Sequence, residues 1–186
     1  ASPPGVVQNP WGVTVHDGHV YVCNDTSHSI SALDATTLAL VRRFGSGGSG
    51  EGQFQNPREI AVGPDSLLYV ADQNNHRIQV YDNDLNFVRS ITGIGAPWGL
   101  CIPTRPDAQG RNVIFSSDGT SGRIYKIDLA TDKVIGWAQT SLGRGEDDLP
   151  VAQQRRRGIV VEARNAEDVH PSLRRRQEDG TTDEHR

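Results

Sequence analysis

The amino-acid sequence predicts an all-β protein made of three repeated units, each a sheet of four short antiparallel strands. An internal repeat and the strand signals within it carry this prediction. The segment Tyr21–Asp34 aligns without a gap with Tyr69–Asp82 at a spacing of 48 residues, and Tyr69–Asp82 aligns with Phe115–Asp128 at a spacing of 46. Four strands in a unit of roughly 40–50 residues are typical of the blades of a β-propeller.

The second repeat shows the four strand signals most clearly. Short runs rich in β-branched and aromatic residues are separated by Gly-Pro-Asp, Asp-Gln-Asn-Asn and Asp-Asn-Asp turns, as expected for antiparallel strands. The runs are Glu59–Val62, Leu67–Ala71, Arg77–Tyr81 and Phe87–Ile91. No segment shows a helical periodicity strong enough to compete with this pattern.

Each repeat opens with a proline that precedes a short apolar strand. The three openings are Asn9–Val13, Asn56–Ile60 and Ala96–Leu100. Extra loop residues in Pro103–Arg111 account for the shifted spacing of the third repeat. The glycine-rich run Gly45–Gly52 lacks the Gly-Lys-Ser/Thr ending of a phosphate-binding loop, so we interpret it as the link between two blades.

The second repeat resembles the NHL repeat. The likeness is carried by Gly45–Phe54, by Asn56-Pro57, and by Tyr69–Asp72 with Asn75–Asp82, and it extends over about residues 7–145. The resemblance implies a closed propeller, commonly with six blades. It also implies relatives that include scaffolds, peptidyl-α-hydroxyglycine α-amidating lyases and gluconolactonase-like hydrolases.

The pattern predicts a propeller domain over residues 1–145, with blades at about 7–48, 49–93 and 94–145. The segment 146–186 contains no aromatic residue, and it cannot bury enough apolar area to offset its ordering entropy. We expect it to be a disordered or divergent tail. A closed propeller needs at least about four blades. We therefore expect the chain to be a fragment, or else to close the ring by self-association with a second copy.

Composition and charge exclude some classes of protein. No run approaches the roughly 18 apolar residues that a membrane helix needs. Residues 1–148 hold 11 Lys/Arg against 16 Asp/Glu, a net charge of −5, which argues against binding of RNA or other nucleic acids. Cys23 and Cys101 lie within apolar strand patterns, and we interpret both as small buried hydrophobic residues. The Pro-rich start without Met favours a processed or cut end, and it favours a secreted or extracytoplasmic location.

The NHL resemblance places the loops that lead into the innermost strands on one face of the propeller. At equivalent positions these loops carry Trp11, Arg58 and Trp98. Two indoles and a guanidinium around the mouth of the central channel could stack on, and pair with, an aromatic or anionic ligand. The alternative interpretation is that Trp11 and Trp98 only pack between blades.

The loops between the second and third strands lie on the same face by resemblance and add His28 and His76 to the candidate site. We interpret both histidines as turn residues rather than metal ligands, because the third repeat has Gly122 there and a zinc site needs a clustered ligand set. In the lyase relatives, the metal-binding histidines lie where this chain has its two tryptophans and its arginine. This departure argues against lyase chemistry in these three blades.

Carboxylates end the second strand in two of the repeats. Asp72 and Asp118 each lie five residues before an arginine, Arg77 and Arg123, while Asn24 is their counterpart in the first repeat. We expect an Asp–Arg pair to stabilise the turn wherever both residues are present.

The sequence therefore favours a non-catalytic scaffold that binds a peptide, a protein or a small ligand on the face described above. No catalytic residue, metal ligand or cofactor is assigned to these blades. The alternative is an enzyme, a metal-dependent lyase or hydrolase whose zinc or calcium ligands lie in blades absent from this chain.

Overall fold

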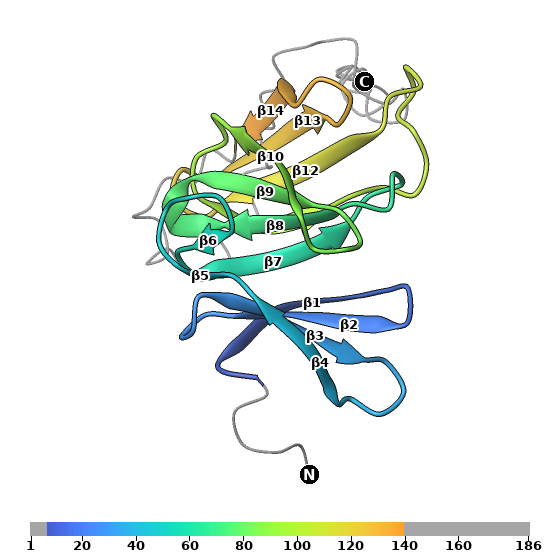
Figure 1. Cartoon of the computed structure of the whole chain (residues 1–186). Coiled ribbons are helices and arrows are strands. Elements are labelled where there is room, and N and C mark those ends of the chain that lie inside the picture. Colours follow the sequence, from blue (N-terminus) through green and yellow to red (C-terminus); the bar gives the residue numbers. More distant parts are fainter. Residues whose placement is uncertain (1–6, 140–186) are drawn as a thin grey trace, which may run out of the picture.

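The computed structural model describes residues 7–139, which form three four-stranded antiparallel sheets (Figure 1). Blade 1 contains β1 (Pro10–His16), β2 (His19–Asn24), β3 (Ser29–Asp34) and β4 (Leu40–Phe44). Blade 2 contains β7 (Pro57–Val62), β8 (Leu68–Asp72), β9 (Arg77–Tyr81) and β10 (Phe87–Thr92). Blade 3 contains β11 (Pro97–Cys101), β12 (Val113–Asp118), β13 (Arg123–Asp128) and β14 (Lys133–Gln139).

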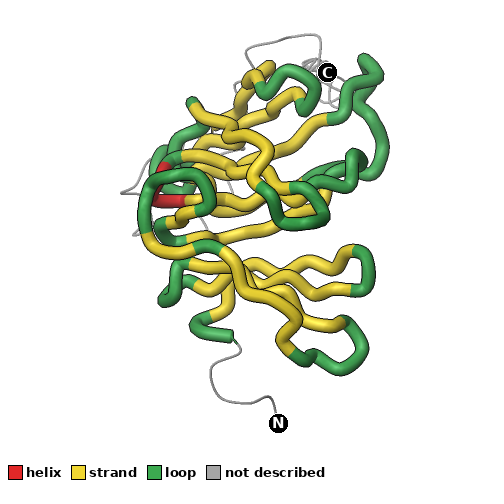
Figure 2. The backbone as a smooth tube through the Cα atoms, viewed as in Figure 1, coloured by secondary structure: helices red, strands yellow, loops and turns green. Residues whose placement is uncertain are grey.

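In each blade, neighbouring strands follow one another along the chain, which confirms the predicted fold class of four-stranded propeller blades. The link between blades 1 and 2 adds a short parallel pair, β5 (Ser46–Gly47) with β6 (Gln53–Phe54). Within residues 7–139, one 3-10 turn, η1 (Gln73–Asn75), interrupts the β structure (Figure 2). The predicted tail, 146–186, lies outside the described residues.

Each pair of adjacent blades encloses an apolar core, because alternate side chains of a strand point to opposite faces of its sheet. In β8, Leu68 and Val70 point into the core shared with blade 1, while Tyr69 points into the core shared with blade 3. The first core also contains Tyr21, Cys23, Ile30, Ala32, Phe54, Ile60 and Tyr81. The second also contains Ile78, Val80, Ile91, Ile94, Ile114, Tyr125, Ile127 and Leu129.

The two cysteines differ in their surroundings. Cys23 is buried, as predicted, but Cys101 is exposed, so the prediction of a buried side chain was wrong there. Cys101 pairs with Phe115 across β11 and β12, whereas the preceding residue, Leu100, packs against the core shared with blade 2. Alternation along β11 therefore turns the Cys101 side chain toward the face that blade 2 does not cover.

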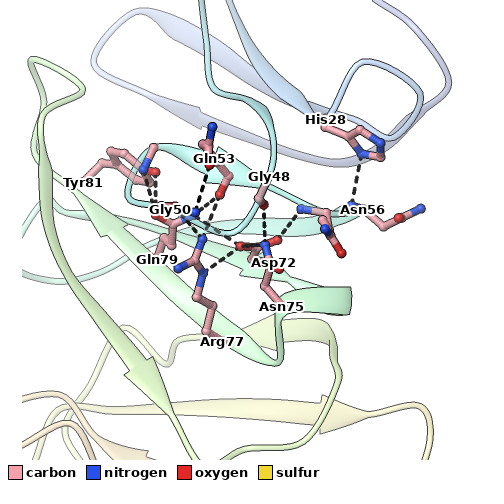
Figure 3. Close-up of polar contacts among 12 residues, drawn as sticks. His28, Gly48, Gly50, Gln53, Asn56, Asp72, Asn75, Arg77, Gln79 and Tyr81 are labelled. Carbon is pink, nitrogen blue, oxygen red and sulfur yellow. Dashed lines mark hydrogen bonds and ion pairs between the residues drawn. The ribbon is translucent and has the colours of Figure 1, made fainter.

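The glycine-rich link is held in place by the side chains of blade 2 (Figure 3). Asn75 Nδ2 donates to the carbonyl of Gly48 at 2.8 Å, and Arg77 Nη2 donates to the carbonyls of Gly50 and Gln53 at 2.8 and 2.9 Å. Asp72 accepts from Arg77 Nε and from Asn75 Nδ2, each at 2.8 Å. The predicted Asp–Arg pair is thus present in blade 2, where it anchors the link.

The corresponding pair in blade 3 is absent, so the prediction of an Asp118–Arg123 ion pair was wrong. Asp118 accepts hydrogen bonds from the Thr120 amide at 2.8 Å and from the Ser121 hydroxyl. Arg123 donates instead to Gln139 Oε1 at 3.2 Å and stacks on Trp137. The Gly-Thr-Ser turn after Asp118 supplies its own donors, which leaves the arginine free to take another acceptor.

We expect the cores between blades to dominate stability. Ile78→Ala removes a fully buried side chain from the second core and should lower the free energy of unfolding by about 2–5 kcal/mol. Val88→Ala on the neighbouring strand β10, where the side chain is 44% exposed, should change it by no more than about 0.5 kcal/mol. Urea unfolding followed by circular dichroism measures both. Equal losses in the two variants would contradict this assignment of the core.

Candidate ligand-binding face

A β-bulge interrupts the start of the innermost strand in every blade. The pairing register shifts between Pro10 and Val13 in β1, between Pro57 and Ile60 in β7, and after Pro97 in β11. A bulge bends its strand and redirects the side chains within it. The bulge residues include Trp11, Arg58 and Trp98, the three positions singled out from the sequence.

The structure brings these three side chains together. The guanidinium carbon of Arg58 lies 4.0 Å from the ring centroid of Trp11 and 5.5 Å from that of Trp98. Each side chain comes from a different blade, so the arrangement is a clasp across all three. Cation–π contacts of this kind contribute about 0.5–1 kcal/mol at exposed sites and about 2 kcal/mol when desolvated.

The indoles of the clasp are only partly covered. Trp11 is 52% exposed and Trp98 is 45% exposed. Trp98 also packs directly over Gly119, where an added Cβ would lie 2.5 Å from the indole ring. This close approach fixes the position of Trp98 and leaves about half of the side chain available for contact with another molecule.

One nitrogen of the Arg58 guanidinium donates a hydrogen bond within the protein, and another has no acceptor. Its Nε donates to Oε1 of Gln73, a buried residue of η1. Its Nη1 is buried and has no hydrogen-bond partner among residues 7–139. Sequence reasoning missed Gln73, because nothing in its local pattern sets it apart from the other polar residues of its turn.

A repeated contact positions the loop that leads into each bulge. The residue that ends the second strand accepts a backbone N–H from this loop: Asn24 from Gln8 at 2.9 Å, Asp72 from Gln55 at 2.7 Å, and Asp118 from Ala96. Burial works to raise the pKa of Asp118, but hydrogen bonds from Ser121, Thr120 and Ala96 hold it below its usual value. These carboxyl and amide groups therefore position the loops that lead into the bulges.

Glu59 is a second feature of the site that sequence reasoning missed. Its Oε1 accepts from the Ile60 amide at 3.0 Å, and the side chain lies over Gly12 of blade 1, where an added Cβ would be 2.5 Å from that oxygen. Burial raises the pKa of the Glu59 carboxyl. The signal that could have found it is the glycine at the equivalent position of both other repeats, Gly12 and Gly99.

The two candidate histidines occupy left-handed turn positions. The φ angles are +49° for His28 and +53° for His76, and the third repeat has Gly122 at +69°. This backbone conformation explains why glycine can replace histidine there. His28 Nδ1 lies 3.3 Å from the Asn56 amide, beside the bulge of blade 2 (Figure 3). His76 is exposed. Within residues 7–139, no three His, Cys, Asp or Glu side chains form a group able to hold a metal ion.

A separate hollow of about 420 Å³ lies at the opposite ends of the strands, between blades 2 and 3. Its lining residues are Pro64, Asp65, Gly110, Arg111, Asn112, Asp128, Leu129 and Ala130. Two of its charged side chains are engaged within the protein, since Arg111 pairs with Asp107 at 2.8 Å and Asp65 accepts from the Tyr69 hydroxyl at 2.7 Å. This hollow is distinct from the face that bears the clasp.

Comparison with known proteins agrees with the geometry of the blades. Residues 54–81 match the family model of the NHL repeat. The chain is 31% identical over 155 residues to NHL repeat-containing protein 2 of Gallus gallus. This alignment covers 79% of this chain and 19% of that protein. The chain is also 27% identical over 136 residues to the chloroplastic protein SUPPRESSOR OF QUENCHING 1 of Arabidopsis thaliana, in an alignment that covers 69% of this chain and 13% of that protein.

Among solved structures, a catalytically inactive virginiamycin B lyase from Staphylococcus aureus with quinupristin has the same fold. The TM-score is 0.57 at 15% sequence identity, over 77% of this chain and 45% of the lyase. The described part of the chain is thus a set of β-propeller blades. More particularly, these are three blades of an NHL-repeat propeller. The chain spans less than a fifth of the length of both curated relatives.

We expect Glu59 to lower stability at neutral pH. A carboxyl group whose pKa is raised in the folded state does not destabilise the protein when the pH lies below its pKa in the unfolded state. The free energy of unfolding then falls as the pH rises from the unfolded-state pKa toward the folded-state pKa. Glu59→Gln should therefore raise the urea midpoint at pH 7 and lose that advantage near about pH 3.5, below the usual glutamate pKa. Glu51→Gln, at an exposed glutamate of the link, is the matched control. An advantage for Glu59→Gln that is equal at both pH values would contradict the assignment.

Proposed function

We propose that these blades form a non-catalytic scaffold that binds a peptide, a protein or a small ligand on the face bearing Trp11, Arg58 and Trp98. The observation that carries the proposal is the clasp itself, in which two half-exposed indoles flank one guanidinium. Large aromatic side chains and arginine are the residues that most often dominate binding energy at interfaces. His28 and His76 belong to the rim of the same face, at the turns between the second and third strands.

The clasp also has a structural role, since it joins three blades. Two features support a binding role beside it. The indoles keep about half of their surface in solvent, and the bulges that hold them bend their strands and redirect the side chains there. An enzyme of the lyase or hydrolase kind stays the alternative, with metal ligands supplied by other blades. The likeness to virginiamycin B lyase concerns the fold and lends that alternative no further weight.

We also propose that the outer faces of the terminal blades receive further blades. In blade 1, Val13 and Val15 of β1 are 59% and 64% exposed, and in blade 3 Ile124 of β13 is 48% exposed. The facing surfaces of adjacent blades within the structure are apolar and buried. The partner is expected to be the rest of a longer propeller, and a second copy of this chain is the alternative. No helix in the described part of the chain is long and apolar enough to cross a membrane.

Light scattering on a sizing column distinguishes the two sources of further blades. If a longer parent protein supplies them, the isolated chain should run as a monomer of 20.3 kDa or as a polydisperse aggregate. A defined dimer of twice that mass would show instead that two copies close one ring.

Selection of peptides from a displayed random library tests the binding role directly. Peptides captured by the wild-type chain should bind Trp98→Ala or Trp11→Ala about 5–30-fold more weakly, since loss of an aromatic anchor costs about 1–2 kcal/mol. Trp137→Ala on β14, the remaining tryptophan of the chain, is the matched control. Variants that lose thermal stability but retain full affinity would show that the two indoles serve only to join the blades.

A further inference from the structure

We propose that the ligand of this face presents a carboxylate to the edge of the Arg58 guanidinium, with an apolar or aromatic group beside it on the exposed indoles. The inference rests on the proposed binding function, because it names the class of ligand for that same site. Arg58 has a guanidinium nitrogen without an acceptor, and the two indoles beside it are half exposed.

The shape of the guanidinium restricts where an acceptor from a ligand can lie. The Arg58 guanidinium lies near both indoles, with the ring centroids of Trp11 and Trp98 4.0 and 5.5 Å from its central carbon. The N–H groups of a guanidinium point outward in its plane, so a hydrogen-bond acceptor for Arg58 must lie in that plane. A planar carboxylate suits this geometry, since its two oxygens can lie in the same plane.

The edge of the guanidinium still lacks an acceptor. Gln73 takes the hydrogen bond of Nε, which fixes the orientation of the fork. Nη1 is buried and unpaired among residues 7–139. A buried donor without an acceptor lowers stability, and arginine cannot lose its proton to relieve the cost. An acceptor from a ligand would remove this penalty.

Arg58 differs in this respect from other arginines of the structure. Arg77, Arg89 and Arg111 each pair with an aspartate at 2.7 or 2.8 Å. Arg58 has no ion pair within residues 7–139, and its neighbour Glu59 lies over Gly12, with Oε1 bonded to the Ile60 amide. The carboxylate that these three arginines receive from the chain is missing at Arg58.

The repeat itself does not require this cation. The equivalent bulge positions of blades 1 and 3 hold tryptophan, so a blade of this kind forms without a guanidinium there. The two indoles provide apolar surface next to the unpaired edge, because each is about half exposed. A ligand that carries an acid group beside a ring or an aliphatic group would contact both features at once.

A set of matched small probes tests the inference on the intact chain. Benzoate, benzamide, benzylammonium and phenyl phosphate share one ring and differ in the polar group. We expect benzoate to shift the indole N–H signals of Trp11 and Trp98 and the Nε–H signal of Arg58 in ¹⁵N-labelled protein. The indole signal of Trp137 should not move. Benzamide and benzylammonium should bind at least ten-fold more weakly than benzoate.

Variants of the arginine separate charge from geometry. Arg58→Gln should weaken benzoate binding at least ten-fold. Arg58→Lys, which keeps the charge but not the planar fork, should weaken it several-fold. Arg105→Gln removes the same charge from an exposed loop at the other end of the strands, and it should leave benzoate binding unchanged. The spectra of all variants report whether the blades remain folded, and Arg58→Lys keeps the test valid where the glutamine variant loses stability.

Each contrary outcome has its own meaning. If benzamide or benzylammonium shifts the two indole N–H signals as strongly as benzoate does, the proposal that the ligand presents a carboxylate is wrong, while the proposal of a binding face stands. Tighter binding of phenyl phosphate than of benzoate would assign the site to phosphate instead. Failure of benzoate to shift either indole at about 50 mM, or undiminished binding by Arg58→Gln, overturns the inference. The binding function is judged separately, by the effect of the tryptophan variants on peptide capture.

Discussion

Strand β8 lies at the centre of the molecule, and all five of its side chains, Leu68–Asp72, are buried. Two of them enter the core shared with blade 1, and Tyr69 enters the core shared with blade 3. A sheet with apolar residues on both faces must be covered on both faces, and neighbouring sheets of the same kind provide that cover. Because of this constraint the three blades stack face to face in the order of the sequence. The stacking in turn places the innermost strands next to one another.

The site depends on the same stacking. Three bulges at equivalent places would scatter three unrelated side chains if the blades were independent. Because adjacent blades bury their faces together, the bulge residues instead converge on one guanidinium. The aspartate or asparagine at the end of each second strand completes the arrangement, since it holds the loop just before the bulge. The geometry of the clasp is therefore set by contacts that the repeat provides in every blade, and its chemistry by the residues that differ.

Much of this could be predicted from the sequence, because the repeat aligns positions that share an environment. The repeat identified the strands, the Asp72–Arg77 pair and the equivalence of Trp11, Arg58 and Trp98, and the NHL resemblance implied that these three lie on one face. It failed where one copy departs from the others: Asp118 takes its hydrogen bonds from the following turn, so Arg123 is released to Gln139. The exposure of Cys101 followed from which face of β11 blade 2 covers, and an apolar strand pattern does not show that.

The residues that the sequence did not reveal, Gln73 and Glu59, share a cause. Each acts through a contact with a neighbour that is distant in sequence: Gln73 with Arg58, and Glu59 with Gly12 of another blade. The pattern within one strand or turn carries no information about such contacts, and for Glu59 only a comparison with Gly12 and Gly99 of the other repeats could have indicated one. A purely structural clasp and a binding site make different demands on these neighbours, however. The packing and cation–π contacts of the clasp stabilise the joined blades, but the unpaired buried nitrogen of Arg58 lowers stability unless a ligand supplies an acceptor. Holding that group in one orientation before the ligand binds reduces the ordering cost of binding. The joining of blades and the recognition of a ligand are thus compatible roles for the same three side chains.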